Sequence, residues 1–286
     1  MKVSVVITTY NRPDFLKEAL VGLKNQTIKP FEVIVIDDNS AKDYQEVFPL
    51  IESLNARYLK QSVSCGANKA RNIGISESSG DVVAFLDDDD VWLPNYLEVI
   101  SAEFTLGCEA VVTGFKQLGK EHVVVVNADN WVTKQSLLRG NTYCGMSGFS
   151  CKRELLEELK FDETLNNGQD WDMYVRLFEK GVQFRNINTP MFLYRFQNED
   201  GIGAKARKMK PNEIQKRLGS ANKHKEFLGD FWFRKRICEQ ILFSLKHKQQ
   251  KAKWIVTAIQ LAGLKATAYF FLNAVRRKLT NKPMSI

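Results

Sequence analysis

VSVVITTYNRPDF, residues 3–15, begins with a nearly unbroken run of apolar and β-branched residues. Such a run is typical of a strand that is covered on both faces, as in a parallel sheet. Asn11 and Pro13 follow as a helix-start signal, and we expect a helix from there to about Gln26. The stretch therefore predicts a buried strand joined by a short polar turn to a helix.

The same alternation continues through the first hundred residues. EVIVI at residues 32–36 and DVVAFL at residues 81–86 predict two further buried strands. Between them we expect a helix, a short strand and a second helix, at about residues 44–54, 57–59 and 68–78. This order predicts an α/β fold with a doubly wound, mostly parallel central sheet flanked by helices.

The pattern after residue 100 is more mixed. Residues from about 109 to 127 read as two strands joined by a turn around Gly119. A helix is expected from near Asp170 to Lys180, followed by extended structure at residues 182–187 and 190–196.

Polar clusters follow three of the predicted strands. Thr8, Thr9 and Tyr10 end the first, Asp37 and Asp38 end the second, and the acidic run of residues 87–90 ends a later one. Ligands of such sheets bind outside the carboxyl ends of the strands. The three clusters therefore predict a binding site at one edge of the sheet.

The acidic run is the strongest chemical signal, and it lies within FLDDDDVWLP, residues 85–94. Four consecutive carboxylates repel one another, and a cation offsets that cost. Their hard oxygen ligands suit Mn²⁺ or Mg²⁺, which also bind phosphate oxygens. A solvated acidic turn before a helix near Pro94 is the alternative, but the neighbouring polar strand ends favour the metal site.

Composition bounds the setting of the chain. Its 286 residues, 44% of them hydrophobic, allow one large α/β domain with an extension. The five cysteines form no C-x-x-C pair, which argues against a disulfide framework and a thiolate zinc site. The first apolar run is too short for a signal-peptide core. We expect a cytoplasmic protein.

Charge divides the chain. The net charge is +8, but residues 205–286 hold 20 Lys and Arg against 4 Asp and Glu, whereas the rest has a net charge of −8. We expect two parts, an α/β domain over residues 1–203 and a helical basic region over residues 204–286. A basic tail on an acidic body indicates a polyanionic partner, either nucleic acid or anionic lipid.

Anionic lipid is the favoured partner, because no groove-binding or base-stacking module is recognisable. Residues 254–275 form an apolar stretch with one charge, Lys265, for which three placements stay open. A helix here could lie on a bilayer, pack on the rest of the protein or span the membrane. We expect peripheral attachment to the cytoplasmic face of the inner membrane.

Five stretches together carry a resemblance to a known family: VSVVITTYNRPDFLKEAL, VIVIDDNS, ANKARNIGI, VVAFLDDDDVWLP and GQDWDMYVRL. In this order they resemble glycosyltransferase family 2, over roughly residues 3–195. The resemblance implies an inverting glycosyltransferase with the GT-A fold, here with a helical basic C-terminal extension. It further implies a role in bacterial surface-polysaccharide synthesis, such as that of O-antigen or capsule.

The resemblance also assigns roles to the polar edge. Nucleotide binding falls on residues that match the family's contacts to base, ribose and phosphates: Thr8, Tyr10, Asp38, Arg71, Asp87 and Asp88. Asp38 corresponds to the acceptor of the uracil imide hydrogen bond. Asp89 corresponds to the ligand of Mn²⁺ or Mg²⁺, and Arg195 to a residue near the diphosphate.

Asp170 resembles the general base that removes the acceptor's hydroxyl proton. The family usually has Glu-Asp here, whereas this chain has Gln169 before Asp170. From the residues alone, Asp170 could instead be a helix N-cap, and the two roles are compatible. Trp171 could be a core residue or a platform for an acceptor sugar.

These assignments predict transfer of a sugar from a UDP-sugar to a hydroxyl of a saccharide acceptor carried on a polyprenyl diphosphate. Two alternatives remain. A nucleotidyltransferase would need a Gly-rich loop after the first strand, and the residues after Ile7 form none. A catalytically impaired GT-A-like scaffold is supported only by Gln169.

Overall fold

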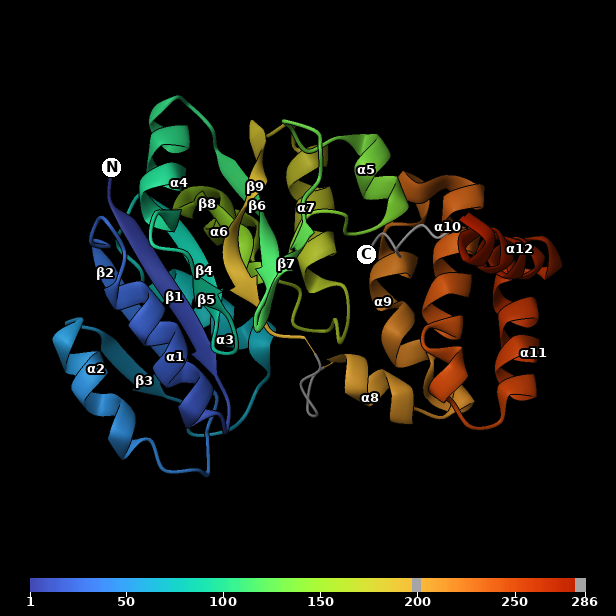
Figure 1. Ribbon diagram of the computed structural model, residues 1–286, viewed down its shortest axis with the longest axis horizontal. Coiled ribbons are helices and arrows are strands. Elements are labelled where there is room, and N and C mark those ends of the chain that lie inside the picture. Colours follow the sequence, from blue (N-terminus) through green and yellow to red (C-terminus); the bar gives the residue numbers. More distant parts are fainter. Residues whose placement is uncertain (197–201, 281–286) are drawn as a thin grey trace. The chain divides into compact units, whose positions relative to one another are not determined.

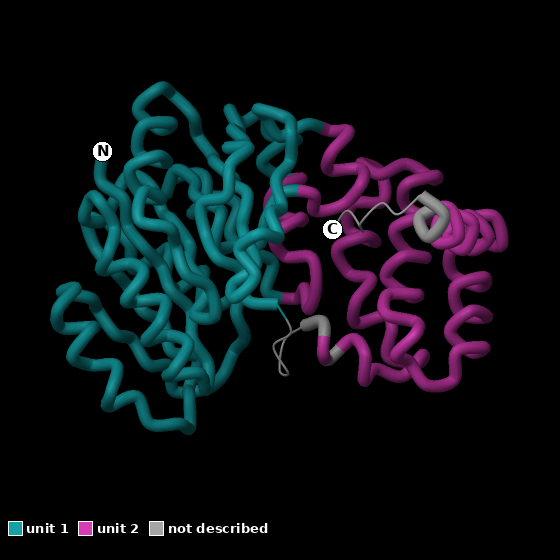
Figure 2. The backbone as a smooth tube through the Cα atoms, in the orientation of Figure 1, with its two compact units in different colours: residues 1–133, 143–163, 176–196 teal, residues 134–142, 164–175, 197–286 magenta. Residues whose placement is uncertain are grey.

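The computed structural model describes residues 1–196 and 202–280. These residues divide into two compact units (Figure 2). Unit 1 comprises residues 1–133, 143–163 and 176–196, and unit 2 comprises residues 134–142 and 164–175 with the described part of 197–286. The sequence placed the boundary between residues 203 and 204. The structure divides the chain at residue 196 and adds two earlier segments to the helical unit.

Unit 1 is built on a sheet of nine strands, counted over the described residues (Figure 1). The strands are β1 Val3–Thr9, β2 Glu32–Asp37, β3 Arg57–Lys60, β4 Val82–Asp87, β5 Val91–Trp92, β6 Ala110–Gln117, β7 Lys120–Val125, β8 Phe149–Lys152 and β9 Phe184–Tyr194. The helices of this unit are α1 Pro13–Lys24, α2 Phe48–Ser53, α3 Ala67–Glu77, α4 Tyr96–Thr105, α6 Arg153–Leu159 and the end of α7 Gln169–Glu179.

The sheet order is β3-β2-β1-β4-β8-β6-β9-β5, with β7 paired to β6. The first four strands are all parallel, as expected from the alternating sequence pattern. Beyond β4 the sheet is mixed, since β8 runs antiparallel to both β4 and β6. The predicted strand pair around Gly119 is confirmed as β6 and β7.

The parallel half brings the predicted polar strand ends together. In the strand register Thr8 lies opposite Asp87 of β4, and Thr9 lies opposite Asp37 of β2. Helix α3 packs against β1 and β2. Gly74 permits this approach, because a Cβ there would lie 2.3 Å from a methyl group of Val6.

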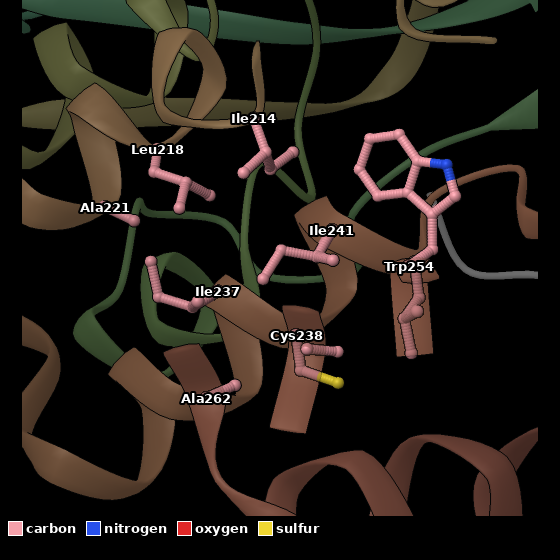
Figure 3. Packing of buried hydrophobic residues seen from close by; sticks show 10 residues of the cluster. Ile214, Leu218, Ala221, Ile237, Cys238, Ile241, Trp254 and Ala262 are labelled. Carbon is pink, nitrogen blue, oxygen red and sulfur yellow. The ribbon is translucent and has the colours of Figure 1, made fainter. Parts of the chain in front are cut away.

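Unit 2 is helical over its described residues. It contains α5 Lys134–Arg139, the first part of α7, α8 Ile202–Lys208, α9 Gln215–Lys223, α10 Lys225–Leu242, α11 Lys251–Ala262 and α12 Leu264–Thr280. Its core gathers apolar side chains from α9, α10 and α11, among them Leu218, Ile237, Ile241 and Trp254 (Figure 3). The basic region therefore has its own hydrophobic core.

The single helix expected over residues 254–275 is wrong. Gly263, with φ +88°, separates α11 from α12, and this left-handed backbone ends a helix readily only at glycine. Trp254 is buried in the unit 2 core. Among the residues that the structure describes, no helix has the length and apolar character needed to cross a membrane.

Candidate active site

The carboxyl edge of the parallel strands in unit 1 gathers the predicted polar residues. Thr9 donates its hydroxyl to Asp88 Oδ2 at 2.8 Å, and its oxygen also lies 2.8 Å from the hydroxyl of Tyr44. Thr8 is half-buried beside them, and Tyr10 exposes half of its surface. An exposed aromatic side chain at a polar edge can stack on a planar ring.

Three members of the acidic run form a compact oxygen cluster. Asp87, Asp89 and Asp90 each offer one carboxylate oxygen, and these three atoms lie within 4.8 Å of one another. Such a set of hard oxygen donors fits Mg²⁺ or Mn²⁺. The sequence assigned the metal to Asp89. The structure adds Asp87 and the buried Asp90 as possible ligands.

Burial and mutual repulsion raise the pKa values of two carboxylates in the acidic run. Burial, with repulsion from Asp89, raises the pKa of Asp88 to about 7. The pKa of Asp90 is raised well above the ordinary value, first by burial and then by repulsion from Asp89 and Asp87. A cation among these carboxylates would favour their ionised forms.

Three arginines surround the acidic run in unit 1. Arg12 contacts Asp88 at 3.3 Å and Asp89 at 3.0 Å. The buried Arg71 donates to Asp87 Oδ1 at 2.7 Å.

Arg195 contacts the same run mainly through backbone groups. Its side chain donates to the Asp89 carbonyl at 3.0 Å and also pairs with Glu18. Its backbone N–H donates to Asp90 Oδ1 at 2.9 Å. The predicted contacts of Arg71 and Arg195 with a nucleotide remain predictions, and what the structure shows is their contact with the acidic run.

Asp38 is held by the loop that begins α3. Its oxygens accept hydrogen bonds from the backbone N–H groups of Cys65 at 2.7 Å and Gly66 at 2.9 Å, and from the Ser64 hydroxyl at 2.8 Å. Burial alone would raise the pKa of Asp38, but these bonds outweigh it and lower the pKa. The Cys65 thiol is a fourth, weaker donor at 3.2 Å.

The predicted base, Asp170, belongs to unit 2 and lies in the first turn of α7. Asn141 donates its side-chain amide to Asp170 Oδ2 at 2.7 Å, and the Trp171 backbone N–H donates to Oδ1 at 2.7 Å. The guanidinium of Arg236 on α10 lies 3.7 Å from the centre of the Trp171 ring and attracts Asp170. Both carboxylate oxygens are thus oriented within this unit.

Neighbouring residues of α7 are structural. Trp171 is fully buried, and its indole N–H donates to the Leu137 carbonyl at 2.8 Å, so it is a core residue. Asp172 is also buried and accepts from Lys223 at 2.9 Å. His224 Nε2 lies 2.7 Å from the same carboxylate oxygen. These contacts fix the start of α7 against α9 and its C-terminal end.

Several residues of these two sites were missed from the sequence. Arg12 stands within the first quoted stretch, and its place just after a buried strand was a usable signal. Asn141 and Arg236 lie far from Asp170 along the chain and match no motif, so only the fold reveals them.

A parallel sheet edge with an acidic cluster and an exposed aromatic ring is suited to binding a divalent cation and a planar ring. The model of the family described as glycosyl transferase family 2 matches residues 4–106. The resemblance read from the sequence is confirmed over residues 4–106, which match the model of this family.

Relatives agree with this match. An uncharacterized glycosyltransferase, YwdF, of Bacillus subtilis is 28% identical over 69% of this chain and 75% of its own length. The GalNAc(5)-diNAcBac-PP-undecaprenol beta-1,3-glucosyltransferase of Campylobacter jejuni is 29% identical over 70% of this chain and 67% of its own. The amylovoran biosynthesis glycosyltransferase AmsB of Erwinia amylovora is 28% identical over 72% and 74%.

Solved structures confirm the GT-A fold. S. aureus TarS matches 93% of this chain with a TM-score of 0.64 and 19% identity, and the match spans 50% of TarS. TarS 1-349 in complex with UDP-GlcNAc gives a TM-score of 0.63 at 17% identity, over 91% of this chain and 71% of that one. The mannosyltransferase PcManGT of Pyrobaculum calidifontis, in complex with GDP-Man and Mn2+, gives 0.61 at 20% identity, over 96% and 80%.

Proposed function

We propose that the protein transfers a sugar from a UDP-sugar to a saccharide hydroxyl with inversion at the anomeric carbon, in a metal-dependent reaction. The observation that carries the proposal is the oxygen cluster of Asp87, Asp89 and Asp90 at the carboxyl edge of the sheet. A metal at this position would stabilise a diphosphate leaving group, because negative charge develops on it as the glycosidic bond breaks.

The acidic run is assigned to stabilisation of the diphosphate leaving group. Asp87, Asp89 and Asp90 would hold Mn²⁺ or Mg²⁺, which supplies Lewis-acid stabilisation of the departing diphosphate. Arg71 holds Asp87 in place through its 2.7 Å ion pair. Asp88, which is turned to Thr9, serves the nucleotide side in this proposal.

Base recognition is assigned to Tyr10 and Asp38. The half-exposed Tyr10 ring offers a face for stacking. Asp38 offers a fixed carboxylate that accepts the uracil imide N–H, a donor that cytosine lacks at the matching ring position. UDP should therefore bind more tightly than CDP or GDP in calorimetric titrations, and equal affinities would remove this assignment.

Asp170 is proposed as the general base. It would accept the proton of the acceptor hydroxyl as that oxygen attacks the anomeric carbon. Its oxygens are oriented by Asn141 and by the Trp171 backbone, and Arg236 supplies a nearby positive charge. A nearby cation favours the ionised form of a carboxylate, which is the form that can accept a proton.

For the acceptor we propose a saccharide carried on a polyprenyl diphosphate, used in surface-polysaccharide synthesis at the cytoplasmic face of a membrane. Support comes from two relatives, whose names give an undecaprenol-linked acceptor and amylovoran biosynthesis. The basic charge of the C-terminal region suits the anionic surface where such acceptors lie.

A donor screen without an acceptor tests the proposal. The purified chain would be incubated with UDP-, GDP-, CDP- and dTDP-sugars, with Mn²⁺, with Mg²⁺ or with EDTA, and release of the nucleoside diphosphate would be measured. Slow, metal-dependent hydrolysis of a UDP-sugar is expected. Hydrolysis of another nucleotide sugar alone would contradict the uridine assignment, and full turnover in EDTA would contradict the metal assignment.

A further inference from the structure

The outward side of α12 carries large apolar residues. Leu264, Phe271, Leu272 and Val275 are all exposed, with 67% of Leu264 and 64% of Leu272 accessible to solvent. At about 100° per residue these four positions fall on one side of the helix. We name this side, from Leu264 to Val275, the α12 face.

The inward side of the same helix is less apolar than the α12 face. Thr267 is buried there and donates its hydroxyl to the Gly263 carbonyl at 3.0 Å. Ala266 and Phe270 pack against the unit 2 core. An ordinary surface helix turns its larger apolar residues inward. In α12 the larger apolar residues point outward instead, where they add nothing to the core of unit 2. The outward residues therefore indicate an interaction surface.

The charged residues of α11 and α12 are all positive. Residues 251–280 contain six Lys and Arg and no Asp or Glu. Lys265 and Arg276 are exposed and lie along one edge of the α12 face by helical spacing. Beyond that edge lies an aromatic pair, since the exposed Phe231 of α10 contacts Tyr269 of α12 with ring centres 6.0 Å apart.

We propose that the α12 face docks on a bilayer that contains anionic lipid, with α12 lying in the plane of the membrane. Leu264, Phe271, Leu272 and Val275 enter the boundary between headgroups and acyl chains. Lys265 and Arg276 stay at the level of the anionic headgroups. This inference rests on the membrane part of the proposed function and deepens it by naming the surface and its lipid class.

Charge complementarity selects the bilayer over other occupants. A second copy of the chain, packed face to face, would bring Lys265 and Arg276 close to the same residues of the other copy. A nucleic acid would match the positive charge but leave the four apolar side chains without an apolar partner. An anionic bilayer satisfies both the apolar and the basic residues.

Co-sedimentation with vesicles tests the docking, with the full chain and without any nucleotide sugar. Wild type should bind phosphatidylcholine vesicles that contain phosphatidylglycerol, and bind pure phosphatidylcholine much more weakly. Leu272→Glu should lower partitioning onto the anionic vesicles by about tenfold or more, because a buried leucine contributes that much. Leu106→Glu is the matched control, since Leu106 is 81% exposed in unit 1 and the substitution adds the same charge.

The results distinguish bilayer docking from self-association. Equal binding of Leu272→Glu and Leu106→Glu, or no binding of wild type to anionic vesicles, would overturn the proposal. An oligomer in light scattering that Leu272→Glu dissociates would assign the face to a second copy instead. Circular dichroism checks folding, and Leu264→Glu repeats the test at a second site. A failure here leaves the proposed transfer reaction standing, because the donor screen uses no lipid.

Discussion

Arg12 Nη1 lies 3.0 Å from Asp89 Oδ2, at the centre of the acidic edge. The same nitrogen lies 3.3 Å from Asp88 Oδ1. Arg12 therefore offsets part of the repulsion within the run. A metal ion held by Asp87, Asp89 and Asp90 would compete with Arg12 for the Asp89 carboxylate.

Arg12→Met is expected to tighten Mn²⁺ binding in the absence of nucleotide, because the competing cation is removed. The gain should be about two- to fivefold, the usual strength of a partly exposed ion pair. Calorimetry with Mn²⁺ alone measures it. Arg57→Met, which breaks an exposed ion pair with Glu77, should leave Mn²⁺ affinity unchanged. Weaker Mn²⁺ binding by Arg12→Met would show that Arg12 supports the site.

Asp38→Asn should destabilise unit 1, because an amide nitrogen cannot accept from the Ser64–Gly66 loop. The Cys65 and Gly66 N–H groups bond to different oxygens of Asp38, so the amide nitrogen leaves one of these two backbone donors without an acceptor. We expect a loss of about 1–3 kcal/mol in the free energy of unfolding. The pKa of Asp38 is lowered in the folded state. Its contribution is therefore complete above the ordinary aspartate pKa of about 4 and is lost as pH falls through the lower, folded-state pKa.

Urea unfolding at neutral and acidic pH checks this sign. The difference in stability between wild type and Asp38→Asn should shrink as the pH is lowered below about 4. Asp230→Asn serves as the control, because Asp230 is exposed and pairs with Arg234 on the surface of α10. A difference that is absent at pH 7, or that grows in acid, would contradict the role given to Asp38.

Asp170→Asn should lower kcat by about 10²–10⁴-fold, the usual contribution of a positioned base. The substitution keeps the size of the side chain but removes the proton acceptor. UDP affinity should change little, because the residues assigned to the nucleotide are in unit 1. Glu179→Gln, at the exposed other end of α7, is the matched control. Wild-type turnover by Asp170→Asn would exclude Asp170 as the base.

Arg236→Met tests the proposed electrostatic role of Arg236 beside Asp170. Burial lowers the pKa of Arg236 to about 10, and attraction from Asp170 and Glu239 opposes the shift, so Arg236 is charged at neutral pH. Removing this charge should move the acidic limb of the kcat–pH profile to higher pH. Asp172 is two residues further along α7 and contacts Lys223 and His224. We expect the Arg236→Met substitution to leave these contacts of Asp172 unchanged. A uniform loss of kcat at every pH would indicate packing on Trp171 alone.

Much of the polar edge of unit 1 could be predicted from the sequence, for a physical reason. Buried parallel strands are continuous apolar runs, and each is followed within a few residues by the polar groups it presents at the edge. Thr8, Tyr10, Asp38 and Asp87 could therefore be assigned to one edge from the strand pattern alone, and the register of Thr8 with Asp87 agrees.

Contacts between segments far apart in the chain could not be predicted in this way. Asn141 and Arg236 approach Asp170 because unit 2 is assembled from three separate segments. The break at Gly263 was also missed, because Trp254 to Val275 reads as one apolar helix unless the positive φ of the glycine is known. Hydrophobic periodicity describes one segment and carries no information about its partners.

The stereochemistry of donor hydrolysis tests the central claim of metal-dependent inversion most directly. An α-linked UDP-sugar that is active in the donor screen would be followed by proton NMR with Mn²⁺ and with EDTA, with Asp89→Ala as a parallel sample. We predict that the first sugar formed is the β-anomer, seen before mutarotation, and that neither EDTA nor Asp89→Ala samples form it. The α-anomer as first product, or β-anomer formed at full rate in EDTA, would contradict the mechanism.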